Sequence, residues 1–389
     1  MRVIVVGAGI AGLAATLSLR RAGCEVTLVE QAPRFGEIGA GIQLAPNATR
    51  VLRRLGLLAA VEAWAHRPPY VSFRRWSDGT EICRFPLGRE AEDEFGAPYL
   101  QVHRADLHTA LAGAVPRASV RLGTAVTGVD QDERSASVTT ADGERLDADL
   151  VVAADGIRSP VRQWLFGADD AVFSGTAAYR AVLTADEVAD LDLPPYAGWL
   201  GPRRHLVHYR LRRGELLNVV GVFETDTAAQ ESWTARAEPG EQLAAFAGWD
   251  PRPRALLERA GQVLRYGIYT RAPLERWNSG RITLLGDSAH AMTPFQAQGA
   301  AQALMDAAVL GDTLIGATSA DVPDALHEYV ARRLPTAHAV QASSARAGGD
   351  YHLPDGPGAD ARDARLRAFA AKDRFGPHAA AWGFEGPGA

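Results

Sequence analysis

The chain has very few cysteines, which argues against a fold held together by disulfides or by zinc. Cys24 and Cys83 are the only two among 389 residues, and their spacing does not match a metal-ligand set. Free thiols are typical of proteins in reducing compartments. We therefore expect a cytoplasmic protein with no disulfide framework and no metal site.

Long apolar runs and blocks of like charge are missing as well. No stretch of about 18 uninterrupted apolar residues occurs, so we expect no transmembrane helix and no membrane partner. The net charge of -5 comes from 41 basic and 46 acidic residues dispersed along the chain. This dispersal argues against a nucleic acid partner. Residues 1–15 are apolar, with glycines at fixed offsets and no signal-type cleavage site, so we expect a buried strand followed by a helix.

The chain is rich in apolar residues, which make up 47% of it and suffice for the cores of two domains. Apolar runs at 3–6 and 25–30, with a helical pattern at 13–22 between them, predict a βαβ unit. Strand and turn patterns with many aromatic residues predict an antiparallel sheet from about 171 to 269, interrupted by a helix near 241–248. Further helices are predicted at 46–55, 105–114, 299–314 and 323–346.

The first motif with chemical meaning is GAGIAG at residues 7–12, between a predicted strand and a predicted helix. Gly7 permits a tight turn, Gly9 lets backbone N–H groups approach a pyrophosphate, and Gly12 allows helix and strand to pack. Glu30 ends the next strand, where a carboxylate accepts ribose hydroxyls. The pattern indicates a dinucleotide site but does not by itself separate FAD from NAD. The cofactor-binding residues assigned here are Gly7, Gly9, Ile10, Ala11, Gly12 and Glu30.

A second polar motif follows the apolar strand predicted at 281–285. Asp287 stands at the end of this strand, where it could accept a ribityl hydroxyl of an extended flavin cofactor. The N–H groups of Gly299 and Ala300 open the next helix, and its positive end would stabilise an anionic reduced flavin. An ordinary helix with an aspartate cap would give the same local pattern.

Two further polar residues are candidates for contacts with the cofactor. Asp155 follows the apolar strand predicted at 150–154, although Asp-Gly is also a common turn dipeptide. Arg104 opens a predicted helix, where it could reach a phosphate or a flavin oxygen, and a plain surface arginine is the alternative.

These motifs, in this order and at these separations, resemble those of the group A flavoprotein monooxygenases over nearly the whole chain. GEIGAGIQ at 36–43, Pro46-Asn47 and YHLPDGP at 351–357 look like salicylate hydroxylase and its relatives, the hydroxybenzoate and hydroxynicotinate monooxygenases. The chain departs from that family's usual pattern at Ala291 and at 304–306 (LMD), and neither departure falls on the cofactor contacts named above.

The resemblance implies one FAD, no separate nicotinamide domain, and NADH or NADPH as a transient co-substrate. It implies that O2 is used to hydroxylate a small phenolic or amino-substituted aromatic acid through a flavin C4a-hydroperoxide. It also carries over four further positions as cofactor contacts: Gln31, Gly41, Val126 and Pro294.

The fold implied by the resemblance is α/β, with a Rossmann-like FAD-binding domain of the p-hydroxybenzoate hydroxylase type, an inserted antiparallel substrate sheet and C-terminal helices. We assign 1–70, 100–170 and 276–347 to the FAD-binding domain and 71–99 and 171–275 to the substrate domain. The remaining residues, 348–389, are rich in Gly, Pro and Ala, and we expect them to form a tail that wraps the surface or frays.

The substrate-side residues are predicted from strand alternation at 201–209. His205 and Tyr209 share one face, His208 lies on the other, and the first two are roughly 13 Å apart on an ideal strand. We expect His205 to accept or orient the proton of the substrate hydroxyl and Tyr209 to hydrogen-bond it, since imidazole titrates near neutrality. Arg180 and Pro294 are further candidate substrate contacts.

Two other functions fit the same sequence. One is an FAD-dependent epoxidase or hydroxylase of a larger natural product, which the volume of the pocket would distinguish. The other is a flavin dehydrogenase without oxygen insertion or a nucleotide-binding protein without catalysis. The sequence leaves open the ring substrate, its regiochemistry, any accompanying decarboxylation, NADH against NADPH, and a monomer against a homodimer.

Overall fold

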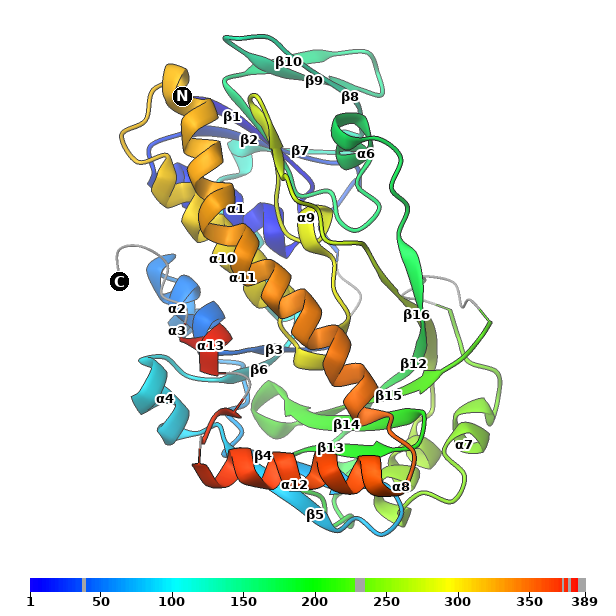
Figure 1. Cartoon of the computed structure of the whole chain (residues 1–389). Helices are drawn as coiled ribbons and strands as arrows, with labels where there is room; N and C mark the ends of the chain where they lie inside the picture. The colour runs from blue at the N-terminus through cyan, green and yellow to red at the C-terminus, as the bar shows by residue number, and fades with distance from the viewer. Residues whose placement is uncertain (37–39, 228–234, 373, 377–378, 384–389) are drawn as a thin grey trace.

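Two large β-sheets connected by long helices organise the chain (Figure 1). The computed structural model describes residues 1–36, 40–227, 235–372, 374–376 and 379–383. Part of the family-like motif at 36–43, namely residues 37–39, lies outside the described residues. In the part that is described, no helix is both long and apolar enough to cross a membrane.

The first sheet is parallel except at one edge, and its central strand is the N-terminal one. β1 (Arg2–Val6) pairs in parallel with β2 (Glu25–Glu30) and with β11 (Leu150–Ala153), and these strands are buried among helices. Burial on both faces explains their unbroken apolar sequences. In order across the sheet, the strands are β17 (Asn278–Ser279), β18 (Ile282–Leu284), β11, β1, β2 and β7 (Val120–Leu122).

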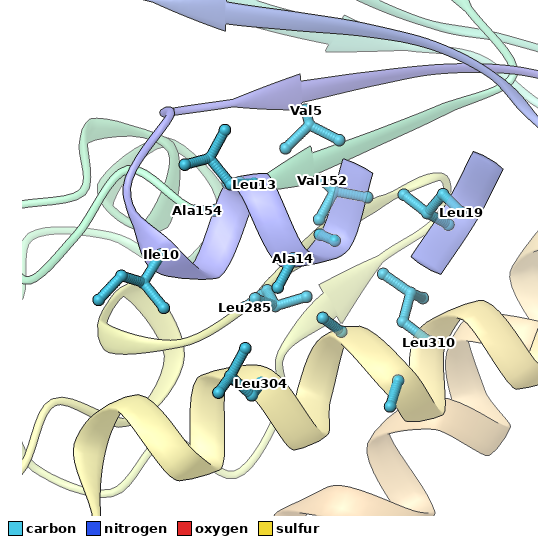
Figure 2. Close-up of a cluster of buried hydrophobic side chains, with 14 of the residues drawn as sticks. Val5, Ile10, Leu13, Ala14, Leu19, Val152, Ala154, Leu285, Leu304 and Leu310 are labelled. Atoms are coloured by element: carbon cyan, nitrogen blue, oxygen red, sulfur yellow. The ribbon is translucent and has the colours of Figure 1, made fainter. Parts of the chain in front are cut away.

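The helices α1 (Ile10–Arg21) and α10 (Gly299–Thr313) pack against each other beside this sheet. Figure 2 shows Ile10 and Ala14 of α1 on the side toward Leu304 of α10, while Leu13 points to Val5 of β1. The two helices come close because Gly311 of α10 has no side chain; a Cβ there would lie 3.0 Å from Cβ of Ser18.

The second sheet is antiparallel except for the parallel pair β13 and β4. In order, its strands are β16 (Leu264–Thr270), β12 (Val172–Thr184), β15 (Leu216–Glu224), β14 (Arg204–Leu211), β13 (Tyr196–Gly201), β4 (Tyr70–Arg75) and β5 (Glu81–Pro86). The helices α7 (Glu241–Ala245) and α8 (Pro251–Arg259) cover one face, where Trp199, Phe246 and Leu256 are buried. The predicted α/β class with an inserted antiparallel sheet is confirmed.

The remaining elements form two small sheets and the outer helices. A three-stranded sheet contains β8 (Val126–Gln131), β9 (Ala136–Thr140) and β10 (Arg145–Ala148), and a hairpin pairs β3 (Gly41–Leu44) with β6 (Leu100–His103). The other α-helices are α2 (Pro46–Arg54), α3 (Leu58–Glu62), α4 (Arg89–Phe95), α5 (Arg104–Ala114), α6 (Pro160–Phe166), α9 (Asp287–His290), α11 (Val322–Tyr351), α12 (Pro357–Lys372) and α13 (Ala379–Trp382). The 3-10 turns are η1 (Arg117–Ser119), η2 (Asp186–Val188), η3 (Arg212–Gly214), η4 (Pro294–Gln296) and η5 (Ser319–Asp321).

The segment from residue 348 was predicted to wrap the surface or fray, and its described residues are largely helical and pack on the second sheet rather than fray. α11 continues through Gly348, where the ring of Phe295 takes the space of a side chain; a Cβ there would lie 2.4 Å from it. α12 buries Asp363, which pairs with Arg75 of β4 at 2.9 Å. The sequence analysis missed α12 and also α8, although both segments are rich in Ala, Arg and Leu, which favour a helix.

β4 begins at Tyr70, one residue before the range assigned to the substrate domain, and α12 packs on the second sheet from outside that range. We keep those ranges as a proposed division into an FAD-binding domain and a substrate domain, with the C-terminal segment moved from a free tail to the outer layer of the second sheet.

Candidate active site

The loop between β1 and α1 is shaped by glycines with different tasks. Gly7 has φ +98°, and a Cβ on it would lie 2.5 Å from the carbonyl oxygen of Ala154. A Cβ on Gly12 would lie 1.8 Å from the carbonyl oxygen of Gly7. Gly9, in contrast, has nothing within 4 Å of an added Cβ. Two of the glycines are therefore needed by the fold, while Gly9 leaves the start of the helix open to a ligand.

Glu30 holds this loop in place from the end of β2. Its carboxylate accepts hydrogen bonds from the backbone N–H of Ala8 at 2.7 Å and of Ala32 at 2.8 Å. Each oxygen keeps a further lone pair, so Glu30 can both order the loop and accept ribose hydroxyls. The next residue, Gln31, is exposed at the same edge, and Val126 lies partly buried at the start of β8.

A pair of alanine substitutions separates the two roles of these glycines. We expect Gly9→Ala to leave the unfolding free energy within about 1 kcal/mol of wild type but to weaken FAD binding at least about tenfold, because its Cβ would meet the pyrophosphate. Gly12→Ala should lower stability by about 1–3 kcal/mol or more, because the backbone must shift. FAD titration and urea unfolding of the two apoproteins measure both effects. Equal FAD affinity in Gly9→Ala and wild type would contradict the assignment of this loop.

Asp155 lies at the end of β11, beside the glycine loop. One of its oxygens accepts a hydrogen bond from the N–H of Val161 at 3.3 Å, while the other, Oδ1, is buried with no partner among the described residues. Burial raises the pKa of Asp155 above its ordinary value. A hydroxyl donor on a bound cofactor would offset the cost of this buried oxygen. Arg104 begins α5, and its N–H donates to the carbonyl of Ala40 in the stretch that leads into β3.

The second predicted cradle is a short turn that follows β18. Gly286 has φ +69°, and its N–H donates to Asp306 at 3.0 Å. Asp287 begins α9 with an exposed side chain, and Gly299 and Ala300 begin α10 with partly exposed backbone. Pro294 is exposed in η4 between them. The structure therefore brings the second group of predicted cofactor residues to one turn and one helix start.

A buried ionic network supports this turn. Asp306 of α10 is fully buried, 2.5 Å from Nε2 of His290 and 2.7 Å from Nε of Arg333 on α11. Burial by itself would raise the pKa of Asp306, but the charges of His290 and Arg333 lower it below its ordinary value. Asp306 therefore supports the cradle through Gly286, a role that the sequence analysis did not foresee.

Two supporting contacts were also missed from the sequence. Arg162 of α6 is 1% exposed and donates to the carbonyls of Ser288 and Ala289 at 3.2 and 3.1 Å. These two hydrogen bonds hold α9 in place. Asn47 donates to Gln298 at the start of α10 at 3.0 Å. The Pro46-Asn47 motif was noted for its resemblance, but nothing local in the sequence points to partners 251 residues away.

His205 lies where the second sheet meets the loop of the second cradle. Its ring is 5.5 Å from the ring of Phe295 in η4 and 5.4 Å from the ring of Tyr351 at the end of α11. Its Nδ1 is 2.7 Å from Nε2 of His352. The strand places this imidazole on the face away from α7 and α8, as alternation predicted, and beside the cofactor loops.

Tyr209 lies on the same face as His205 but belongs to another cluster. Its ring is 5.8 Å from that of Tyr196, whose hydroxyl donates to Gln43 at 2.9 Å. A Cβ on Gly41 would lie 2.6 Å from the Tyr209 hydroxyl, so Gly41 is needed for this packing as well. Among the described residues no contact joins Tyr209 to His205, and one small substrate would have to span the distance between them.

Arg180 approaches this face from β12. Its guanidinium lies 4.8 Å from the ring centre of Tyr266 and donates to that hydroxyl at 3.1 Å. The contact holds a cationic group on the sheet face that carries His205.

His208 lies on the opposite face, among the residues covered by α7 and α8. Its Nδ1 accepts a hydrogen bond from Nε1 of Trp199 at 3.2 Å, and its Nε2 donates to the carbonyl of Pro194 at 3.0 Å. The contact with Trp199 requires the neutral ring, because a protonated imidazole has no acceptor nitrogen. Burial lowers the pKa of His208 to about 4.

This buried imidazole predicts a loss of stability in acid. Between the ordinary pKa of about 6.5 and the folded value of about 4, the unfolded chain binds a proton that the folded chain does not, so stability falls as pH falls by about 1.4 kcal/mol per pH unit. Urea unfolding at pH 7.5 and 5.0 should show a weaker pH dependence in His208→Asn than in wild type. Identical pH dependence in the two proteins would show that His208 does not carry this effect.

Comparison with known proteins adds independent evidence. The family described as FAD binding domain matches residues 1–344. A 3-amino-4-hydroxybenzoate 2-monooxygenase of Streptomyces platensis, PtmB3, is 40% identical over 99% of this chain and 96% of its own. A 3-hydroxybenzoate 6-hydroxylase of Klebsiella oxytoca is 38% identical, with 90% and 89% covered. A salicylate hydroxylase in a substrate complex has a TM-score of 0.84 at 27% identity, covering 99% of this chain and 96% of its own.

Proposed function

The chain belongs to the FAD-binding family of flavin-dependent aromatic monooxygenases, and we propose that it hydroxylates the ring of a small amino- or hydroxy-substituted benzoate with NADH or NADPH as reductant. One observation carries the proposal on the structural side. A buried imidazole, His205, stands between the substrate sheet and the loop of the second cofactor cradle.

The residues present fit an extended FAD. The open space at Gly9 suits a pyrophosphate, and the buried unpaired oxygen of Asp155 suits a cofactor hydroxyl. Bound FAD supplies the activated oxygen atom that is inserted into the ring. The residues proposed to hold it are Gly7, Gly9, Ile10, Ala11, Gly12, Glu30, Gln31, Gly41, Arg104, Val126, Asp155, Asp287, Pro294, Gly299 and Ala300.

We propose that this chain's own residues prepare the substrate. His205 accepts the proton of the ring hydroxyl, which makes the ring more electron-rich and more reactive toward an electrophilic oxygen. Arg180 pairs with the carboxylate of the acid. Tyr209 and Pro294 line the space that the ring occupies. An aromatic ring with a hydroxyl group and a carboxylate thus matches the base His205 and the cation Arg180, which lie on the same sheet face.

The substrate class follows from the relatives. Among the small aromatic acids they act on, 3-amino-4-hydroxybenzoate is the candidate we place first, because PtmB3 is aligned over almost the full length of both chains. The sequence contains no second Gly-x-Gly-x-x-Gly after a strand, so we propose that the nicotinamide cofactor binds transiently rather than on a domain of its own. The two buried free thiols fit a cytoplasmic location.

The test is a screen of aromatic acids with the purified yellow protein. We expect 3-amino-4-hydroxybenzoate, or a close hydroxybenzoate, to accelerate NAD(P)H oxidation and to yield a product that carries one atom from ¹⁸O2. Salicylate, 3-hydroxybenzoate and 6-hydroxynicotinate serve as comparison substrates. Oxidation that produces only hydrogen peroxide and ignores every aromatic acid would instead favour a flavin enzyme without oxygen insertion.

A further inference from the structure

Three polar side chains form a line from the substrate face of the second sheet to the surface. His205 of β14 is 3% exposed, and its Nδ1 contacts Nε2 of His352 at 2.7 Å. His352 follows α11 directly, and its Nδ1 contacts Oε1 of Glu224, the last residue of β15, at 3.2 Å. The Glu224 side chain is 36% exposed, so the line runs from a buried imidazole to solvent.

The carboxylate at the outer end dictates the tautomer of both rings. An ionised Glu224 can only accept, so Nδ1 of His352 carries the hydrogen and its Nε2 is an acceptor. The hydrogen in the next contact must then come from Nδ1 of His205. The neutral His205 is left with an unprotonated Nε2, the form in which an imidazole acts as a base.

The surrounding groups keep this arrangement charged at the surface and neutral inside. The guanidinium of Arg203 pairs with the other oxygen of Glu224 at 3.1 Å. The backbone N–H of Arg203 donates to the carbonyl of His352 at 2.9 Å. Arg204 lies next to His205 on β14, close enough to act on the charge of His352. The hydroxyphenyl ring of Tyr351 packs against His205. Burial, followed by the neighbouring His352, lowers the pKa of His205. Burial also lowers the pKa of His352, against the opposing effect of Glu224.

We propose that Glu224 and His352 are positioning residues that set His205 as a base and carry the substrate proton to solvent. The proposal rests on the proposed function and deepens it. The proton of the substrate hydroxyl passes to Nε2 of His205, the Nδ1 proton of His205 to Nε2 of His352, and the Nδ1 proton of His352 to Glu224, which releases it to water. Each ring gains one proton and loses one, so both end neutral in the other tautomer.

The first measurement of the test is made on the resting holoenzyme and does not depend on turnover. Long-range ¹H–¹⁵N spectra of ¹⁵N-labelled protein distinguish the two imidazole tautomers, and single substitutions assign the signals of His205 and His352 among ten histidines. In wild type we expect His205 protonated at Nδ1 and bare at Nε2. In Glu224→Gln we expect both tautomers, because an amide can donate as well as accept.

The second measurement is the single-turnover rate of product formation across pH. Glu224→Gln and His352→Gln should each lower it about tenfold to a hundredfold, by analogy with the partners that orient metal-bound imidazoles, and shift the optimum upward. Glu224→Asp should restore most of the rate. The matched control is Glu241→Gln, a carboxylate with a 31% exposed side chain that accepts from Tyr179 on the far side of the sheet. It should behave as wild type.

The outcomes separate this proposal from the proposed function. If wild type hydroxylates no aromatic acid, the proposed function fails. The spectra then decide by themselves whether Glu224 and His352 set the tautomer of His205. A protonated Nε2 in wild-type His205, or a tautomer unchanged in Glu224→Gln, would overturn the proposal. So would a rate and pH profile of Glu224→Gln and His352→Gln that match those of Glu241→Gln.

Discussion

His205→Ala should keep its FAD and its fold and lose about 10²–10⁴-fold in the rate of ring hydroxylation, the usual range for acid–base assistance. The large loss is expected because His205 is the imidazole at the junction of the substrate sheet and the cofactor loop. Removing the ring also leaves Nε2 of His352 without its partner, at a cost of about 1–3 kcal/mol. His205→Gln, which refills part of the space, should lose as much of the hydroxylation rate as His205→Ala but less of the stability.

The measurement is the amount of hydroxylated product formed per NAD(P)H consumed. In His205→Ala we expect substrate-stimulated flavin reduction to continue while oxygen is diverted to hydrogen peroxide. His208→Asn is the control from the other face of the same strand, with lower stability and unchanged coupling. A normal yield in His205→Ala, or a greater loss of coupling in His208→Asn, would show that the base lies elsewhere.

Asp306→Ala should lower the free energy of unfolding by about 3–5 kcal/mol, because it leaves Arg333 as a buried charge without its carboxylate. The same change removes the acceptor of the Gly286 N–H and the partner of His290, so the turn that presents Asp287 loses its support. We therefore expect FAD affinity to fall together with stability. Urea unfolding and flavin absorbance after gel filtration measure the two losses.

Asp312 gives a matched control on the same helix. Its pair with Arg54 lies at the surface, where the arginine side chain is 39% exposed, so Asp312→Ala should cost no more than about 1 kcal/mol. In Asp306→Leu combined with Arg333→Met, apolar packing replaces the buried pair and should recover much of the stability. If Asp306→Ala proved no less stable than Asp312→Ala, the network would not be what holds the turn.

The cofactor loops could be predicted because their chemistry is local. Gly7, Gly9 and Gly12 lie within six residues; Gly7 adopts a positive φ, Gly12 permits a close backbone approach, and Gly9 leaves the helix start open. The opposite facing of His205 and His208 was predictable for a similar reason, since side chains alternate along any strand. These features need no knowledge of what packs on them.

The partners of the same residues could not be predicted, because each depends on segments that meet only in the folded chain. Asp306 gained its role from Arg333 on another helix, and Arg162 supports α9 across 126 residues of sequence. α12 formed where composition suggested a loose tail, because the second sheet offers it an apolar and charged surface to pack on.

The sequence by itself determined the α/β class, the two turns that we propose as cofactor cradles and the face of β14 that His205 occupies, since these follow from short motifs and strand periodicity. Only the tertiary structure decided that Tyr209 and His205 belong to separate clusters and that His205 meets His352, 147 residues away, with Glu224 beyond it. Periodicity fixes the direction in which a side chain points. What it points at is set by the packing of distant elements, which no local pattern encodes.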